Sequence, residues 1–410
     1  MRVLWLMTRY WPAVGGAENH TRRIIHELSE AGHSNTVVAH WDSNRTDWLR
    51  GTTITAPSET VRYQDGPYVP VIRLGFPLAR RLQTVLPAAT YYLQMRLSAA
   101  ALARMLEDTI TQECGTDWDI IHAVRIGREP LYLAGYHLAR RLGIPFVFTP
   151  LHHPRWVGRR YLTYIHLYRS ADALIALTAY ERSLYGALGV DPGRITVTGV
   201  GPILPPAADG ARFRATHGIS GQLILFLGQK YPYKGFEQLL AAAAHVWQRH
   251  PDTTFAFLGP RTSASRAVFS RVRDTRILEL DAVDLQTKGD ALAACDVFCL
   301  PSEQESFAGV FTEAWSYGKP VIGCGIPAVQ EVITDGEDGI IVPVGKSADL
   351  AAAILALLDD PLLRARLGAA GQHKVASRYT WSRIAHTITD TYDSVRSRTR
   401  PATPGSHSPA

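Results

Sequence analysis

The chain has 410 residues, of which 46% are hydrophobic and 20% charged, and its formal net charge is +6. This length predicts two domains, and this composition excludes a fibrous or wholly disordered protein. No apolar run reaches the roughly 18 residues that a membrane-spanning helix needs, and the first residues lack the pattern of a secretion signal. We therefore expect a cytoplasmic protein.

The positive charge is concentrated in the first half of the chain. Residues 1–205 carry 22 Arg, no Lys and 16 acidic side chains, whereas residues 206–395 carry 18 basic and 21 acidic side chains. A basic surface suits nucleic acid, anionic lipid or a phosphorylated substrate. We expect no nucleic-acid partner, because zinc-finger spacing, aromatic RNA-binding motifs and Lys-rich stripes are missing. The four cysteines have no metal-ligand spacing, and we expect no metal site.

Short apolar runs alternate with helical periodicity through the first half. This alternation predicts a parallel sheet covered by helices on both faces. A helix with Ile24, Ile25 and Leu28 on one face is expected after the first strand, and the polar residues 41–68 predict an irregular excursion. The predicted strands are 3–7, 36–39, 120–123, 146–148, 173–176 and 195–197.

A Gly- and Pro-rich stretch at 201–210 predicts a linker, after which the alternation restarts. The expected fold class is therefore α/β, with two Rossmann-like doubly wound domains facing across a cleft, where the carboxyl ends of the strands bind ligands. We expect domains over 1–204 and 205–395, the second with a last helix that could cross back to the first, and a disordered tail over 396–410. The strands predicted in the second half are 223–227, 255–258, 297–300 and 321–322.

Polar and small residues gather after the predicted strand at 297–300. Glu305 and Glu313 flank a loop of small residues, in which backbone N–H groups can approach an anion near the start of a helix. Two carboxylates there can accept hydrogen bonds from the hydroxyls of a sugar and of a ribose. The simpler alternative is a solvated loop with a capping Glu. The loop residues expected at the site are Ser306, Phe307, Ala308, Gly309 and Val310.

The first strand of each half is also followed by a candidate loop. Lys230 and Lys234 follow the strand at 223–227, where an ammonium group would stabilise the charge on a departing phosphate. Ordinary surface lysines are the alternative. Gly15 and Gly16 follow the strand at 3–7, where glycines allow a ligand to approach the backbone closely, although a plain turn explains them equally well.

Taken in order, the motifs of this chain resemble family 4 of the retaining glycosyltransferases over residues 1–395. They are Gly15-Gly16-Ala17-Glu18, Gly32-His33, Lys234-Gly235, Glu305-x7-Glu313, Gly318-Lys319-Pro320-Val321-Ile322, and Glu331-Val332-Ile333 with Asp335-Gly336 and Gly339. The resemblance implies the GT-B architecture, with a nucleotide-diphosphate sugar as donor in the second domain and the acceptor mostly in the first. It also implies that the chemistry needs neither a metal nor another cofactor.

The resemblance further implies roles for single residues. Lys234 would contact the donor diphosphate, Glu313 would hold the ribose, and Glu305 would hold the transferred sugar. Backbone N–H groups of 307–310 would face the sugar or a phosphate. Gly16 would lie at the donor phosphates across the cleft.

Three departures from the family pattern bear on the site. Gln229 stands where the family places an arginine, and we expect Lys230 to replace the lost charge. The acidic residue of the family's turn at the domain junction is missing from 198–202. The family's histidine near the reacting sugar corresponds to either His152 or His153, and the spacing does not decide between them.

The sequence therefore predicts a retaining glycosyltransferase that acts in polysaccharide, lipopolysaccharide or glycolipid synthesis, with Lys234, Glu305 and one of the two histidines at the reacting atoms. A soluble small-molecule acceptor, a nucleotide-sugar 2-epimerase and a non-catalytic nucleotide-sugar-binding protein are the alternatives. Arginines beside apolar residues at 74–78 and 91–93 suggest peripheral docking on the anionic inner face of the cell membrane, near a lipid-linked acceptor. Solvated arginines over ordinary helices are the alternative. The arginines are Arg73, Arg80, Arg81, Arg159 and Arg160.

Overall fold

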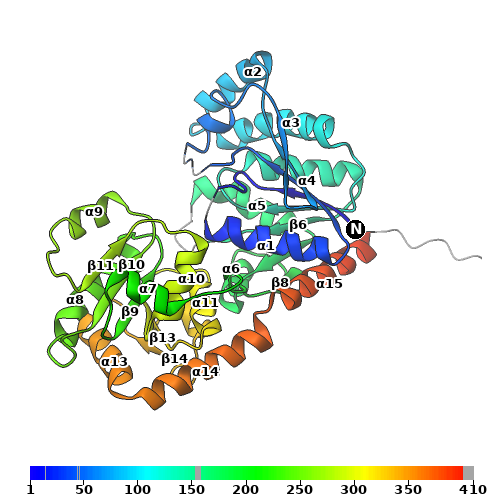
Figure 1. Cartoon of the computed structure of the whole chain (residues 1–410). Coiled ribbons are helices and arrows are strands. Elements are labelled where there is room, and N and C mark those ends of the chain that lie inside the picture. The colour runs from blue at the N-terminus through cyan, green and yellow to red at the C-terminus, as the bar shows by residue number, and fades with distance from the viewer. Residues whose placement is uncertain (14, 44, 46, 153–157, 400–410) are drawn as a thin grey trace, which may run out of the picture. The chain divides into compact units, whose positions relative to one another are not determined.

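The computed structural model describes residues 1–13, 15–43, 45, 47–152 and 158–399. The chain divides into two compact units, one formed by Met1–Thr198 with the helix that begins at Trp381, the other by Gly199–Thr380. Each unit is a sheet between layers of helices (Figure 1). No helix in the described part of the chain is both long and apolar enough to cross a bilayer.

The first unit holds an eight-stranded sheet in the order β3-β4-β2-β1-β5-β6-β7-β8. The strand pairs are parallel, except that β3 runs antiparallel to β4. The strands are β1 (Arg2–Leu6), β2 (Ser34–Ala39), β3 (Val61–Asp65), β4 (Val69–Arg73), β5 (Ile120–Val124), β6 (Phe146–Thr149), β7 (Ala173–Ala176) and β8 (Ile195–Val197). The helices are α1 (Gly16–Glu30), α2 (Leu78–Ala89), α3 (Met95–Cys114), α4 (Pro130–Leu142), α5 (Leu162–Ser170), α6 (Ala179–Ala187) and α15 (Trp381–Thr399).

The expectation of an irregular excursion over 41–68 is wrong for part of that stretch. It contains the 3-10 helix η1 (Arg50–Thr52) and strand β3. β3 lies at the edge of the sheet and leaves Val61, Arg62 and Gln64 exposed. Edge strands carry polar side chains because one side of them faces water, so the polar composition of β3 concealed its strand character.

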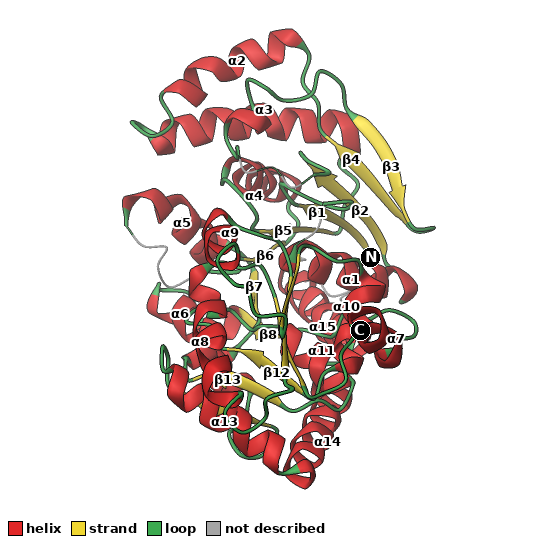
Figure 2. Cartoon of the chain, turned by 60° about the vertical axis from the view of Figure 1, so that its left-hand side comes forward, coloured by secondary structure: helices red, strands yellow, loops and turns green. Residues whose placement is uncertain are grey.

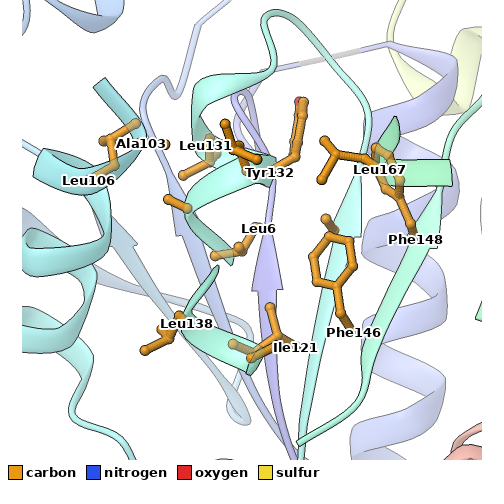
Figure 3. Close-up of a cluster of buried hydrophobic side chains, with 14 of the residues drawn as sticks. Leu6, Ala103, Leu106, Ile121, Leu131, Tyr132, Leu138, Phe146, Phe148 and Leu167 are labelled. Carbon is orange, nitrogen blue, oxygen red and sulfur yellow. The ribbon is translucent and has the colours of Figure 1, made fainter. Parts of the chain in front are cut away.

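The core of the first unit lies on both faces of this sheet. On one face Leu6, Ile121 and Phe146 from the strands pack against α3 and α4 (Figure 3). Each of these three side chains is fully buried. Burial on both faces explains why these strands read as continuous apolar runs.

The helix α15 completes the opposite face, although it comes from the end of the chain. Ile384, Ile388 and Tyr392 recur every four residues and belong to the core cluster on that face, which is the spacing of one helix face. The hydroxyl of Tyr392 lies 2.6 Å from Nδ1 of His122 on β5. α15 also packs along α1 (Figure 1). The tail predicted to be disordered from 396 is helical to Thr399, and the rest of it, 400–410, lies outside the described residues.

The second unit holds a six-stranded parallel sheet in the order β11-β10-β9-β12-β13-β14. The strands are β9 (Leu223–Leu227), β10 (Thr254–Leu258), β11 (Ile277–Leu280), β12 (Val297–Leu300), β13 (Val321–Cys324) and β14 (Gly339–Val342). The helices are α7 (Gly210–His217), α8 (Phe236–Val246), α9 (Ser263–Phe269), α10 (Leu285–Ala294), α11 (Val310–Ser316), α12 (Pro327–Val332), α13 (Ser347–Asp359) and α14 (Pro361–Arg378). The sequence did not predict β11 and β14, the two edge strands, whose residues are mostly only half-buried.

Residues of the predicted linker at 201–210 pack on the second unit. The backbone N–H of Asp209 donates to Asp290 over 2.7 Å, and Pro205 lies so close to Gly289 that a Cβ there would come within 2.3 Å of the proline ring. The division between the units therefore falls at Thr198, earlier than the expected boundary at residue 204.

Candidate active site

The topology of the second sheet marks one place for a ligand. From β9 the chain continues outward to β10 and β11, and then returns to β12 on the other side of β9. The loops that follow β9 and β12 therefore lead away in opposite directions, which leaves a crevice at the carboxyl ends of these strands. Lys234 follows β9, and both Glu305 and Glu313 follow β12. The fold thus brings three predicted site residues to one switch point.

The two loops at this switch point are tied together by their backbones. Gly235 has a φ of +79°, and a Cβ there would lie 2.1 Å from the carbonyl oxygen of Pro301. Only glycine fits such a position. The N–H of Glu303 donates to the carbonyl oxygen of Tyr233 over 2.8 Å. This close approach places the side chain of Lys234 beside the second loop.

Lys234 and Glu305 form an ion pair across the two loops. Nζ of Lys234 lies 2.6 Å from Oε1 of Glu305, and the two side chains are 20% and 8% exposed. The pair is thus largely withdrawn from water, where an ammonium interacts more strongly with a phosphate than it does in bulk solvent. It provides one cation for a diphosphate and one acceptor for sugar hydroxyls.

The small-residue loop between Glu305 and α11 has an unusual backbone. Ala308 adopts a φ of +63°, a conformation that costs a non-glycine residue energy and that is frequent at ligand-binding loops. Phe307 is buried, with its ring 5.2 Å from that of Tyr379. Among the described residues, the backbone N–H groups of Phe307, Ala308 and Gly309 have no hydrogen-bond acceptor. They therefore remain available to a ligand.

Glu313 on α11 has a partner that the sequence analysis missed. Nζ of Lys288 on α10 lies 2.7 Å from Oε1 of Glu313, whereas the buried Oε2 has no hydrogen-bond partner. Burial raises the pKa of this carboxyl group, and the Lys288 ammonium and, more weakly, the backbone N–H of Ile203 oppose that rise. Oε2 is thus a buried acceptor left for a hydroxyl donor. No local spacing signals Lys288, because it precedes Glu313 on a different helix.

Lys230 does not lie where the sequence predicted. Its side chain is fully buried, and Nζ donates to the carbonyl oxygens of Gly259 and Leu280, each over 2.6 Å, and to Glu279. Burial lowers the pKa of Lys230, and Glu279 opposes that shift. With its donors directed at β10 and β11, Lys230 does not supply the charge missing at Gln229, which is exposed. The expectation that it replaces the arginine is therefore corrected.

The glycines of the first unit begin α1. Gly15 caps the helix in extended conformation, and a Cβ on it would lie 2.3 Å from Oε2 of Glu18. Glu18 is buried and forms an ion pair with Arg9. A Cβ on Gly16 would meet no atom within 4 Å. The close approach of Glu18 therefore explains why residue 15 is a glycine, whereas no neighbouring atom explains the glycine at residue 16.

His152 lies in a buried polar network of the first unit. Its backbone N–H donates to Glu181 over 2.9 Å, and its Nδ1 lies 3.3 Å from the hydroxyl of Tyr168. That hydroxyl accepts a hydrogen bond from Arg125 over 2.7 Å. Arg125 and Tyr168 are further residues that sequence reasoning missed. His153 lies outside the described residues.

Two other features of the described residues stand apart from this site. A hollow of about 860 Å³ lies at the amino ends of β9, β10 and β12, lined by residues such as Arg214, Gln222 and Asp252. Lys234 and Glu305 lie at the other end of the strands, after their carboxyl ends. Over the described ranges, no three His, Cys, Asp or Glu side chains gather as metal ligands.

This architecture is that of the GT-B glycosyltransferases, which confirms the predicted fold class. HepE from Anabaena, solved in complex with UDP-glucose, matches with a TM-score of 0.72 and 18% identity over 96% of this chain and all of that one. Residues 221–360 match the family model described as glycosyl transferases group 1, and residues 15–201 match the glycosyl transferase 4-like domain. The chain belongs to this family of glycosyltransferases, as its motifs predicted.

Curated relatives extend the comparison. The phosphatidyl-myo-inositol mannosyltransferase of Mycobacterium leprae is 37% identical over 177 residues, which are 43% of this chain and 47% of that protein. This chain therefore spans about half the length of that relative. The D-inositol 3-phosphate glycosyltransferase of Frankia alni is 29% identical over 375 residues, 82% of this chain and 84% of that protein.

Proposed function

We propose that this protein is a retaining glycosyltransferase that moves a sugar from a nucleotide-diphosphate sugar to an acceptor hydroxyl. The observation that carries the proposal is the Lys234–Glu305 pair at the switch point of the second sheet. A cation for the diphosphate, an acceptor for sugar hydroxyls and the open Oε2 of Glu313 occur there together. HepE, which has the same fold, was solved with UDP-glucose.

In the proposed reaction the bond between the anomeric carbon and the phosphate oxygen breaks, and the acceptor oxygen bonds to the same carbon. The Lys234 ammonium stabilises the charge that grows on the departing diphosphate. Glu305 accepts hydrogen bonds from the transferred sugar, and Glu313 accepts one from the ribose. The acceptor's proton passes to the leaving phosphate oxygen, so the reaction needs no carboxylate base, and attack from the face of departure retains the configuration. His152 positions the sugar.

For the acceptor we propose a lipid-linked or glycolipid hydroxyl at the inner face of the cell membrane. The relative from M. leprae is named for a phosphatidylinositol acceptor. The longer match from F. alni is named for D-inositol 3-phosphate, which makes a soluble phosphorylated acceptor the second candidate. Both acceptors carry a phosphate, which suits the surplus of arginine in the first half of this chain.

The test begins with the donor. The full chain is titrated with UDP-, GDP- and dTDP-sugars in a calorimeter, and the best donor is then supplied with lipid-linked and soluble acceptors. We expect transfer that depends strictly on an acceptor and a product whose anomeric configuration, read by NMR, equals that of the donor. Conversion of the donor sugar into its 2-epimer without acceptor would overturn the proposal, as would a product of inverted configuration.

A further inference from the structure

Helix α2 carries its leucines on the outside. Leu78, Leu82, Val85 and Leu86 recur at the spacing of one helix face, and each is 41–71% exposed, whereas the buried positions of α2 are Thr84 and Ala88. Amphipathic helices of globular proteins normally turn their large apolar side chains to the core. Here the apolar face is turned away from it.

The position of α2 explains which side is free. α2 packs mainly on α3, and it is the outermost helix on its side of the first unit (Figure 2). The exposed apolar surface continues along the chain after α2. Tyr92, Leu93 and Leu97 are 55%, 89% and 69% exposed. We name the four residues of α2 and these three the leucine face.

The leucine face is bordered mainly by arginines, and the acidic residues on this side of α3 begin at Glu107 and Asp108. Residues 66–106 contain five arginines and no Asp or Glu. Arg96 and Arg104 are exposed. At Tyr92, Arg128 donates to the hydroxyl over 3.0 Å, and the Arg160 guanidinium lies 5.8 Å from the ring centroid. An apolar face with an arginine-rich border is the pattern of helices that lie in the interface of an anionic bilayer.

We infer that the leucine face inserts into the surface of an anionic lipid bilayer. The leucines would enter the acyl boundary, and the arginines would remain at the level of the phosphates, their aliphatic stems lying along the apolar surface. This inference goes beyond the proposed sugar transfer and is measured without a donor or an acceptor. It also changes the surface suggested by the sequence, because Leu74, Phe76 and Tyr91 are fully buried.

A lipid surface fits better than a protein partner. An acidic protein would be held by the arginines at the border, but it would also need a complementary apolar groove for leucines that project as far as Leu86 and Leu93. A bilayer accepts such side chains without a fitted groove, and its phosphates meet every arginine at the same level. A second copy of the chain would place like charges against one another.

The experiment is flotation of the purified full chain with vesicles of phosphatidylcholine alone or mixed with phosphatidylglycerol. The test variant is Leu82→Gln/Leu86→Gln. The matched control is Leu285→Gln/Leu362→Gln, which changes two exposed leucines of the second unit. We expect binding to the anionic vesicles that weakens with salt, an about tenfold or larger loss of partitioning for the test variant, and no loss for the control.

Equal losses for both variants, or equal binding to neutral and anionic vesicles, would overturn the inference. Analytical ultracentrifugation supplies a further outcome. If the parent chain does not bind vesicles but self-associates, and the test variant is monomeric, the leucine face is instead the contact with a second copy of the chain. Nucleotide affinity, measured by calorimetry, should be the same in the parent and the test variant. Failure of the proposed sugar transfer would therefore leave the vesicle result standing.

Discussion

The ammonium nitrogen of Lys234 lies 2.6 Å from Oε1 of Glu305, although 71 residues separate them in the chain. This ion pair links the loop that follows β9 to the loop that follows β12. A diphosphate that binds Lys234 must share the ammonium with Glu305 or displace it. Donor binding and the position of Glu305 are therefore coupled.

Lys234→Ala should lower kcat/KM by about 100-fold or more, because the cation acts on charge that grows in the transition state. Steady-state kinetics measures this loss. Lys346→Ala, which removes an exposed lysine of the same unit, is the control. Turnover of Lys234→Ala at the parent's rate would remove Lys234 from the chemistry.

Lys230→Met should act on folding and not on turnover. Removing one partner of a buried ion pair costs about 3 kcal/mol or more, and Glu279 would keep only Arg261 as a charged partner. Thermal unfolding should show a clearly lower Tm, with kcat/KM near that of the parent at temperatures where the variant is folded. A parent-like Tm with lost turnover would restore the role at the diphosphate that the sequence suggested.

Lys288→Ala should make nucleotide binding depend on pH. Burial raises the pKa of Glu313, and Lys288 opposes that rise, so the variant's carboxyl group should take up a proton at higher pH than the parent's. The neutral form is a poorer acceptor for a ribose hydroxyl. Calorimetric affinity for the nucleotide should therefore begin to fall at a higher pH in the variant than in the parent when the pH is lowered. Parallel pH curves would show that Lys288 does not control Glu313.

Tyr168→Phe should lower kcat by about tenfold while the fold is kept. The change removes the hydroxyl that lies between Arg125 and Nδ1 of His152, so the imidazole loses a contact that orients it. Tyr63→Phe is the control, because Tyr63 belongs to the same unit and its hydroxyl donates to the carbonyl oxygen of Trp11 instead. A kcat unchanged in Tyr168→Phe, or equally reduced in both variants, would separate this network from catalysis.

The first unit should lose stability in acid well before its carboxylates are protonated. Burial lowers the pKa of His20 and His40 to about 4 and that of His122 to about 3. Below about pH 6.5 these histidines bind protons in the unfolded chain but stay neutral in the folded one. The free energy of unfolding is therefore at its full value above about pH 6.5 and decreases as the pH falls toward 4. Each group adds a slope of up to about 1.4 kcal/mol per pH unit.

Urea unfolding followed between about pH 7 and about pH 4.5 measures this slope. His20→Gln should reduce the slope of the free energy of unfolding against pH by the contribution of one histidine. His386→Gln, which changes an exposed ring, should leave it unchanged. A slope that is the same in all three proteins would contradict the assignment to buried histidines.

The sequence was informative where chemistry and burial are local. Interior strands such as β1 and β9 are buried on both faces and read as apolar runs. Lys234 and Glu305 lie in the loops after such strands, so the pattern alone placed them at the carboxyl ends of strands, whereas the strand order that makes this place a switch point comes from the structure. The resemblance to a family then supplied roles that spacing does not give.

The errors concern relationships across the sheet. Lys230 is adjacent in sequence to the site loop, but its partners lie directly after β10 and on β11, 29–50 residues further on, so no local pattern reveals that it points inward. Lys288 was missed for the same reason. Helical periodicity likewise shows that α2 has an apolar face, but it does not state whether the face turns to the core or to solvent.

The helix α15 determines when the first unit can complete its core during synthesis. Ile384, Ile388 and Tyr392 fill one face of a core whose other parts are made from the first 198 residues. At 5–20 residues per second, the ribosome needs roughly 10–40 s to pass through the intervening unit. Throughout that time the nascent first unit exposes the groove that α15 will fill. We expect it to need a chaperone or its own slow folding as protection, and a stop codon near residue 380 should yield aggregates rather than a shorter enzyme.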